Sequence, residues 1–146
     1  MPLHDREREV KGDYELRKSV GRLRELGTCS RDAFMNDPDK IAAAKYYLIV
    51  AVESATDLCH HLIARNMYRI PNDYEDTFRV MEEAGALPGA LVAELGEMAK
   101  LRNRFVYFRS QTDDEAAYET ARNRQNTFKV FLDALSTFLG KDHALS

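Results

Sequence analysis

Residues Asp37 to Asn66 read DPDKIAAAKYYLIVAVESATDLCHHLIARN, and this stretch decides the fold. Asp37 followed by Pro38 is a typical helix start, because an aspartate side chain caps free backbone N–H groups and proline suits the first helical position. From Ile41 to Val52 the helix is apolar on nearly every face, which predicts a central rather than a peripheral position. In so short a chain, part of that apolar surface is expected to meet a second copy of the protein, so the sequence predicts a homodimer.

Helical spacing continues on both sides of this stretch, because apolar residues recur at three and four positions rather than at two. Glycine, proline and capping residues divide the rest of the chain into further helices. The expected segments are Asp13 to Leu26 stopped by Gly27, a short turn at Arg31 to Met35, Tyr74 to Ala84 stopped by Gly85, Ala90 to Phe105, and a last helix capped by Thr112 or Asp113 and ending at Gly140. The prediction is an all-α fold: an up-and-down bundle of about five helices in a single domain, 1–146, with 1–12 and 141–146 as frayed ends.

The composition excludes several classes of function. The 146 residues carry a net charge of -3 and two cysteines, Cys29 and Cys59, whose placement fits neither a disulfide framework nor a zinc signature and favours a reducing cytoplasm. No stretch approaches the roughly 20 apolar residues of a membrane span and the N-terminal residues form no apolar signal core, so we expect a soluble protein without membrane contact. The lack of a glycine-rich phosphate loop, a nucleophile elbow and zinc-ligand spacing argues against an ATPase, a serine hydrolase and a metallohydrolase.

Positive charge is concentrated in one segment, Lys100-Leu-Arg-Asn-Arg-Phe-Val-Tyr-Phe-Arg109, which we call the basic strip. Its four cations give a local charge of +4 within an acidic chain, and such a concentration suits phosphate. The alternative is structural, since cations in the last turns of a helix complement its dipole by a few tenths of a kcal/mol each and exposed arginines usually do no more. Phe105, Val106 and Phe108 are predicted to pack in the core rather than to stack on bases.

Glu53, Asp57 and His61 form a second group, placed at steps of four along the central helix and therefore on one face of it. Carboxylates and histidines on bundle helices can hold a metal, but a di-metal site needs matching ligands on other helices. No second Glu-x-x-His spacing occurs in the chain, so we expect no metal. Carboxylates on so apolar a helix need partners, and we expect Glu53 or Asp57 to pair with an arginine such as Arg102 and to orient it.

Six short segments spread along the chain carry a further signal: Phe34-Met-Asn-Asp-Pro-Asp39, Ala51-Val-Glu-Ser-Ala-Thr-Asp57, Tyr74-Glu-Asp-Thr-Phe78, Glu83-Ala-Gly-Ala-Leu-Pro88, Leu101-Arg-Asn-Arg-Phe-Val106 and Asp113-Asp-Glu-Ala-Ala-Tyr118. Through them the chain resembles the HEPN superfamily, in particular its HepT-like branch of small helical proteins, over almost its whole length. The resemblance implies a toxin of a type VII HEPN/MNT toxin–antitoxin system. Such a toxin is a metal-independent endoribonuclease without a cofactor, acts on RNA as a homodimer, and is restrained by a small MNT-type nucleotidyltransferase antitoxin.

The signature of that family is an arginine, a polar residue and, several residues later, a histidine near the end of a helix. On this pattern Arg102 takes the arginine slot and Asn103 the polar slot, while the histidine slot, five after the arginine, holds Tyr107. Lys100, Arg104 and Arg109 are the candidate phosphate contacts around them. The family often has a tyrosine that accepts adenylyl groups where this chain has Arg109, so adenylyl transfer at that position is chemically excluded.

The tyrosine at position 107 matters because RNA cleavage without a metal needs a group that can take or give a proton near neutral pH. The arginine supplies charge stabilisation, but a phenol with a pKa near 10 is a weaker base than a histidine with a pKa near 6.5 by roughly 3 pH units, or about 4 kcal/mol. We therefore expect the chain to be impaired as a nuclease. Tyr107 is either a natural feature of a degenerate member or an inactivating change, and the alternative function is a non-catalytic module that binds RNA or a nucleotide, or docks the antitoxin.

Overall fold

The computed structural model describes the backbone of residues 3–107 and 110–145 and the side chains of 11–107, 110 and 112–140. Within those residues every regular element is a helix. In chain order these are α1 (Leu3–Leu26), α2 (Arg31–Met35), α3 (Pro38–Arg65), α4 (Tyr74–Glu83), α5 (Gly89–Tyr107), α6 (Gln111–Glu119), a π-helix (Thr120–Arg124) and α7 (Asn126–Leu145). The predicted all-α fold is thus confirmed.

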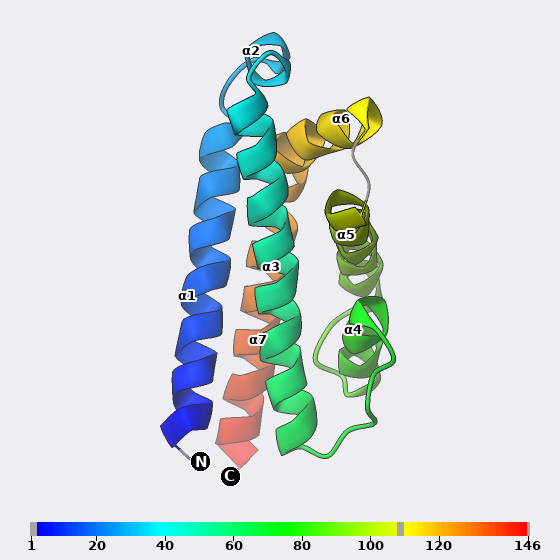
Figure 1. Cartoon of the computed structure of the whole chain (residues 1–146). Helices are drawn as coiled ribbons and strands as arrows, with labels where there is room; N and C mark the ends of the chain where they lie inside the picture. The colour runs from blue at the N-terminus through cyan, green and yellow to red at the C-terminus, as the bar shows by residue number, and fades with distance from the viewer. Residues whose placement is uncertain (1–2, 108–109, 146) are drawn as a thin grey trace.

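The long helices α1, α3 and α7 run side by side, with α4 and α5 on the other flank of α3, as Figure 1 shows. The short helix α6 crosses one end of the bundle, close to the end of α5 (Figure 1). The bundle therefore differs from the expected one mainly at its last helix, which is divided into α6, the π-helix and α7. None of the described helices is long and apolar enough to cross a membrane.

The central helix α3 begins and ends where the sequence predicts. The Asp37 side chain accepts hydrogen bonds from the backbone N–H groups of Asp39 and Lys40, and Asn66 follows the last helical residue. Leu48 and Val52 are fully buried in the core that α3 shares with its neighbours. The central position expected for this helix is therefore confirmed.

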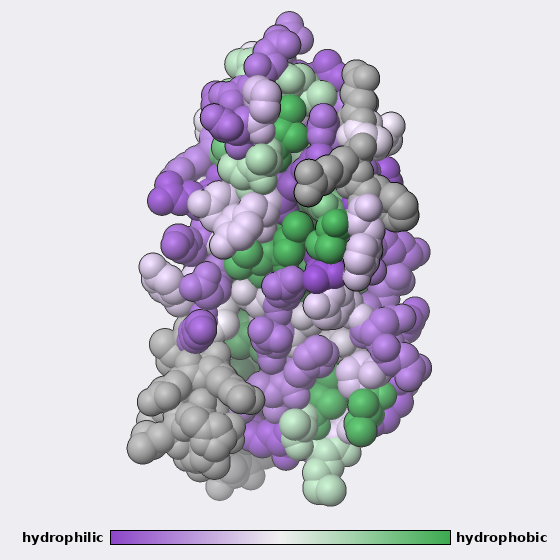
Figure 2. Space-filling view, viewed as in Figure 1, coloured by the Kyte–Doolittle hydropathy of each residue, from purple (hydrophilic) through white to green (hydrophobic). Residues whose placement is uncertain are grey.

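Not all of the apolar surface of α3 is covered within one chain. Tyr46 is 59% exposed, and Ile49 and Val50 are partly exposed on the same side of the helix. Figure 2 shows the corresponding apolar patch over α3 and toward α5. Val106 at the end of α5 is exposed rather than packed in the core as predicted, and Tyr107 is exposed as well. We call these five residues the apolar patch.

The first and the last helix of the chain both extend beyond their expected bounds. Helix α1 begins at Leu3, earlier than the expected Asp13, and the C-terminal segment also continues as helix to Leu145. Residues 1–2 and 146 lie outside the described residues, so the fraying of 1–12 and 141–146 stays a prediction. The apolar stripe of α1 is as expected, with Leu16, Val20 and Leu23 buried.

The two predicted glycine stops have different physical causes. Gly85 has a φ of +79°, the left-handed conformation that ends a helix and that glycine adopts without strain. Helix α1 ends at Leu26, directly before Gly27, as predicted, but Gly27 is not among the described residues with positive φ, so this stop is not left-handed. A Cβ atom there would lie 2.3 Å from the carbonyl oxygen of Ala121 in the π-helix, and the Arg122 side chain donates to the Gly27 carbonyl at 3.1 Å. Gly27 is needed for close packing of two backbones.

Replacing Gly27 with alanine is expected to lower the free energy of unfolding by about 2–3 kcal/mol, because the colliding atom belongs to backbone and cannot rotate away. Urea denaturation followed by circular dichroism measures this change. The matched control is Gly21→Ala in α1, where an added Cβ meets nothing within 4 Å. Equal stabilities of the two variants would contradict the close-packing role of Gly27.

The start of α6 also corrects an expectation. Its N-cap is Ser110, whose side chain accepts a hydrogen bond from the backbone N–H of Asp113, and not Thr112 or Asp113 as the sequence suggested. Asp113 is instead buried, with 1% of its side chain exposed, and binds Arg104. A carboxylate that looks like a helix cap in the sequence is therefore used to join α6 to α5.

Candidate functional site

The described part of the basic strip, residues 100–107, forms the last two turns of α5, but its cations do not share one face. Residues two apart on a helix point to nearly opposite sides, so Arg102 is separated from Lys100 and Arg104. Arg102 faces α3 and α4, where it meets Glu53 and Tyr74. Lys100 and Arg104 lie on the exposed side, and Arg109 lies outside the described residues. The structure thus singles out Arg102.

Each of the three described cations faces a carboxylate. Lys100 Nζ lies 3.8 Å from Glu75 Oε2, and Arg102 Nη2 lies 2.9 Å from Glu53 Oε1. Arg104 Nη2 lies 2.5 Å from Asp113 Oδ1. The positive potential expected from four neighbouring cations is therefore largely offset within the folded chain, and a phosphate must be recognised by geometry as much as by net charge.

Arg102 is held on several sides. Only 15% of its side chain is exposed, and besides the Glu53 ion pair its Nη1 donates to Asn103 Oδ1 at 3.1 Å. Its guanidinium carbon lies 4.8 Å from the centroid of the Tyr74 ring, which is cation–π distance. Its Nε is buried, and no hydrogen-bond acceptor for it is found among the described residues. Each Nη atom has two hydrogens, so each keeps one N–H beyond the bond named above.

The expected ion pair between Glu53 and Arg102 is present, and it forms within one chain. Glu53, Asn103 and Arg102 are thus brought together. Tyr107 is not part of this group, because five residues along a helix correspond to about 140° of rotation and its side chain points into solvent. It is 73% exposed and belongs to the apolar patch. The arginine and the histidine slot therefore lie near each other along α5 but on different sides of it.

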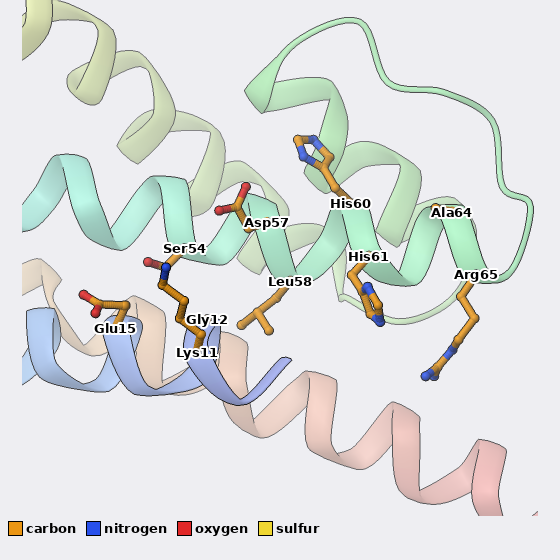
Figure 3. Close-up of a pocket in the computed structure, with 10 residues that line it drawn as sticks. All are labelled: Lys11, Gly12, Glu15, Ser54, Asp57, Leu58, His60, His61, Ala64 and Arg65. Atoms are coloured by element: carbon orange, nitrogen blue, oxygen red, sulfur yellow. The ribbon is translucent and has the colours of Figure 1, made fainter. Parts of the chain in front are cut away.

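Asp57 is placed elsewhere. It lines a hollow of about 720 Å³ between α1 and α3, together with Lys11, Ser54 and His61. Figure 3 shows the Asp57 carboxylate directed away from the His61 ring, although the two residues are one helical turn apart. His60 contacts the Thr77 hydroxyl with its Nε2 at 3.0 Å. In the part of the chain that the structure describes, no group of three or more His, Cys, Asp or Glu residues is arranged to hold a metal ion.

Two residues near the site were not singled out by sequence reasoning. Tyr74 begins a predicted helix and one of the six segments that carry the resemblance, but nothing in its spacing indicates that it covers Arg102 from α4. Lys45 of α3 lies 5.7 Å from the Phe105 ring centroid and 2.5 Å from Asp114 Oδ1, which joins α3 to α5 and α6. A lysine in an apolar helix needs a carboxylate partner, but the sequence does not show which carboxylate that is.

Comparison with known protein families identifies the family of this helical chain. Residues 16–135 match the family described as ribonuclease HepT-like, which is most of the chain. This protein therefore belongs to the ribonuclease HepT-like family. A search among curated proteins finds no significant match.

Among the solved structures with the same fold are chains from toxin–antitoxin complexes and a protein of unknown function. A chain in a crystal structure of a toxin–antitoxin complex with AMP-PNP superposes with a TM-score of 0.82 at 16% identity, covering 90% of this chain and 98% of the other. The tri-AMPylated HEPN toxin of Shewanella oneidensis, in complex with its MNT antitoxin, gives 0.81 at 17% identity over 94% and 99%. The cytosolic Bacillus subtilis protein YutE gives 0.73 at 17% identity over 91% of each chain. These similarities establish a common fold.

Proposed function

We propose that this chain is the toxin of a HEPN/MNT toxin–antitoxin pair and acts in the cytoplasm on RNA, as a metal-independent endoribonuclease weakened by the tyrosine at position 107. The observation that carries the proposal is the largely buried Arg102 guanidinium, which has two N–H groups still to donate. We infer from the resemblance that Arg102 takes the family's arginine position. Arginine forks of this kind bind phosphate oxygens in pairs. Asn103 holds one Nη atom in place, and Lys100, Arg104 and Arg109 are the outer candidates for phosphate contact.

A homodimer completes the proposed site. Tyr107 and Val106 are exposed at the end of α5 next to the open face of α3. A second copy that covers the apolar patch would remove these side chains from water, which is energetically favourable. Within one chain Arg102 and Tyr107 point to different sides of α5, so the proposal requires the dimer to bring Tyr107 of one copy within reach of an RNA phosphate bound by Arg102.

The proposed partner is an MNT-type nucleotidyltransferase antitoxin. The support is the fold shared with a HEPN toxin that was solved in complex with an MNT antitoxin. Co-expression of the chain with a nucleotidyltransferase encoded next to it is expected to give a complex that survives size-exclusion chromatography. Separate elution of the two proteins would count against this partner.

Changing Arg102 to alanine is expected to weaken binding of a single-stranded RNA oligonucleotide by at least about tenfold, because it removes a paired phosphate contact. Fluorescence anisotropy at fixed salt measures the dissociation constant, since phosphate contacts depend strongly on ionic strength. The control is Arg17→Ala, which removes an exposed arginine of α1 that is ion-paired with Asp13 of the same helix. If the two variants bind RNA equally well, the proposed site is wrong.

A second candidate function is a non-catalytic module that binds RNA or a nucleotide, or docks the antitoxin. The observation in its favour is the phenol at position 107, together with the carboxylates that offset all three described cations of the strip. The two functions share Arg102 and differ in turnover. Cleavage by a protein with histidine restored at position 107 separates them.

A further inference from the structure

Arg102 is held by residues from three helices, and the contact from α4 differs in kind from the other two. Glu53 of α3 and Asn103 of α5 accept hydrogen bonds in the plane of the guanidinium. Tyr74 of α4 lies against the guanidinium with its ring centroid 4.8 Å away. In-plane hydrogen bonds fix where the Nη atoms point, whereas a ring under a flat cation prevents it from tilting out of that plane.

The position of the Tyr74 ring is itself fixed by the start of α4. Tyr74 directly follows the N-cap residue Asp73, whose side chain accepts a hydrogen bond from the Asp76 backbone N–H at 2.8 Å. The buried Asp76 carboxylate in turn binds Arg69 through both of its oxygens and accepts from the Asn72 backbone N–H. The corner that presents the ring is thus tied down on both sides of Tyr74.

A ring also holds a cation without neutralising it. A carboxylate such as Glu53 supplies a full negative charge and uses an N–H, so it competes with phosphate for the same group. The face of a tyrosine attracts the guanidinium through its quadrupole and leaves every N–H available. Because only 15% of the Arg102 side chain is exposed, this attraction operates with little competing water.

The geometry points to Tyr74 as a positioning residue for phosphate binding: its ring keeps the Arg102 guanidinium in the orientation in which the two remaining Nη hydrogens face the RNA backbone. This inference rests on the proposed function, because it assigns a role toward RNA. Tyr74 does not touch the substrate itself. Its effect passes through Arg102, so the inference can be tested by combining substitutions of the two residues in one protein.

The test measures binding of a single-stranded RNA oligonucleotide by Tyr74→Leu, Tyr74→Phe, Arg102→Ala and the double variant Tyr74→Leu/Arg102→Ala. We expect Tyr74→Leu to bind about fivefold more weakly and Tyr74→Phe to bind as the unaltered protein does, because phenylalanine keeps the ring face. In the Arg102→Ala background the leucine change should have no further effect. The control is Tyr14→Leu, which removes an exposed tyrosine of α1 on the far side of α3 (Figure 1).

The outcomes separate this inference from the proposed function. If Tyr74→Leu binds RNA normally while Arg102→Ala binds it weakly, the role of Tyr74 is overturned and the proposed site is retained. The same conclusion follows if the double variant loses as much binding free energy as the two single variants together. Normal binding by Arg102→Ala overturns the site and the inference together. If Tyr74→Leu does not fold, position 74 is instead replaced by phenylalanines that carry increasing numbers of fluorine atoms. Fluorine reduces the negative potential of the ring face while the shape of the side chain stays nearly constant. Binding that falls stepwise along that series supports the inference, and constant binding overturns it.

Discussion

A Tyr107→His protein is expected to cleave single-stranded RNA at least about 100-fold faster than the unaltered protein. An imidazole is a usable base near neutral pH, whereas a phenol is almost wholly protonated there. The substitution is structurally mild because Tyr107 is the last residue of α5 and its side chain is mostly in solvent. The cleavage rate of the histidine variant should rise as pH increases through about 6.5 if the imidazole acts as the base.

The measurement is the initial rate of cleavage of one labelled RNA by both proteins in the presence of a metal chelator. Tyr107→Phe is the matched control, because it keeps the ring and removes the hydroxyl, and it should gain nothing. Adding Arg102→Ala to Tyr107→His should return the rate to the low level, which ties the gain to the proposed site rather than to a contaminating nuclease. Equal rates for the unaltered and histidine proteins would contradict the assignment of position 107. RNA binding without cleavage by the histidine variant would favour the non-catalytic module.

Changing Asp76 to asparagine is expected to lower the melting temperature by roughly 5–10 °C at neutral pH. Asp76 is buried and binds Arg69 through both oxygens, accepts from the Asn72 backbone N–H, and accepts from Arg79. An asparagine keeps the shape but removes the charge that these donors face. The expected loss is moderate because the Arg69 side chain is 44% exposed and water compensates part of it.

The same carboxylate predicts how stability changes with pH. The hydrogen bond from Arg69, followed by that from the Asn72 backbone, lowers the pKa of Asp76 well below its ordinary value. A carboxylate whose pKa is lower in the folded state stabilises the fold above its unfolded pKa of about 4. That contribution should disappear progressively as the pH falls from there through the folded pKa. The difference in melting temperature between the unaltered protein and Asp76→Asn should therefore be constant at neutral pH and shrink in acid.

Thermal unfolding between neutral and acidic pH measures both effects. Glu83→Gln is the matched control, because Glu83 binds the same Arg69 from an exposed position and should change the melting temperature by no more than about 2 °C. A loss in Asp76→Asn that equals the loss in Glu83→Gln, or one that does not depend on pH, would contradict the role assigned to the buried carboxylate.

The parts of the fold that the sequence predicts well depend on local signals. The bounds of α3 follow from the Asp37-Pro38 cap and from the loss of the apolar pattern after Arg65, and both involve neighbouring residues only. Gly85 was also correctly assigned, because a left-handed helix stop is a property of the backbone at that residue. Local chemistry alone determines such features, so a single sequence is enough to find them.

The features that the sequence does not predict depend on contacts between helices. Gly27 is required by the backbone of a segment nearly a hundred residues later, and its sequence context resembles an ordinary helix stop. The π-helix at Thr120–Arg124 leaves the apolar spacing of the last segment intact, since Ala117, Ala121 and Phe128 are all buried. Nothing in the spacing of these residues shows that the helix changes direction there.

The candidate site likewise has features that the sequence predicts and features that depend on helix packing. Sequence reasoning selected Arg102 and expected Glu53 or Asp57 as its partner, because a carboxylate in an apolar helix needs a cation; the structure shows that the partner is Glu53. It did not foresee that Glu75 and Asp113 would offset Lys100 and Arg104, or that Tyr74 would lie against Arg102. Those residues come from α4 and α6, and only the packing of the helices brings them to α5.

The most direct test of the central claim is a crystal structure of the unaltered chain with a short single-stranded RNA, since a slow nuclease should keep the RNA uncut. We predict a homodimer in which a phosphate group accepts hydrogen bonds from the Nη atoms of Arg102, with Tyr107 of either copy beside it and the apolar patch covered. RNA bound on another face, or an Arg102 that stays closed between Glu53 and Tyr74 with no phosphate in contact, would contradict the account.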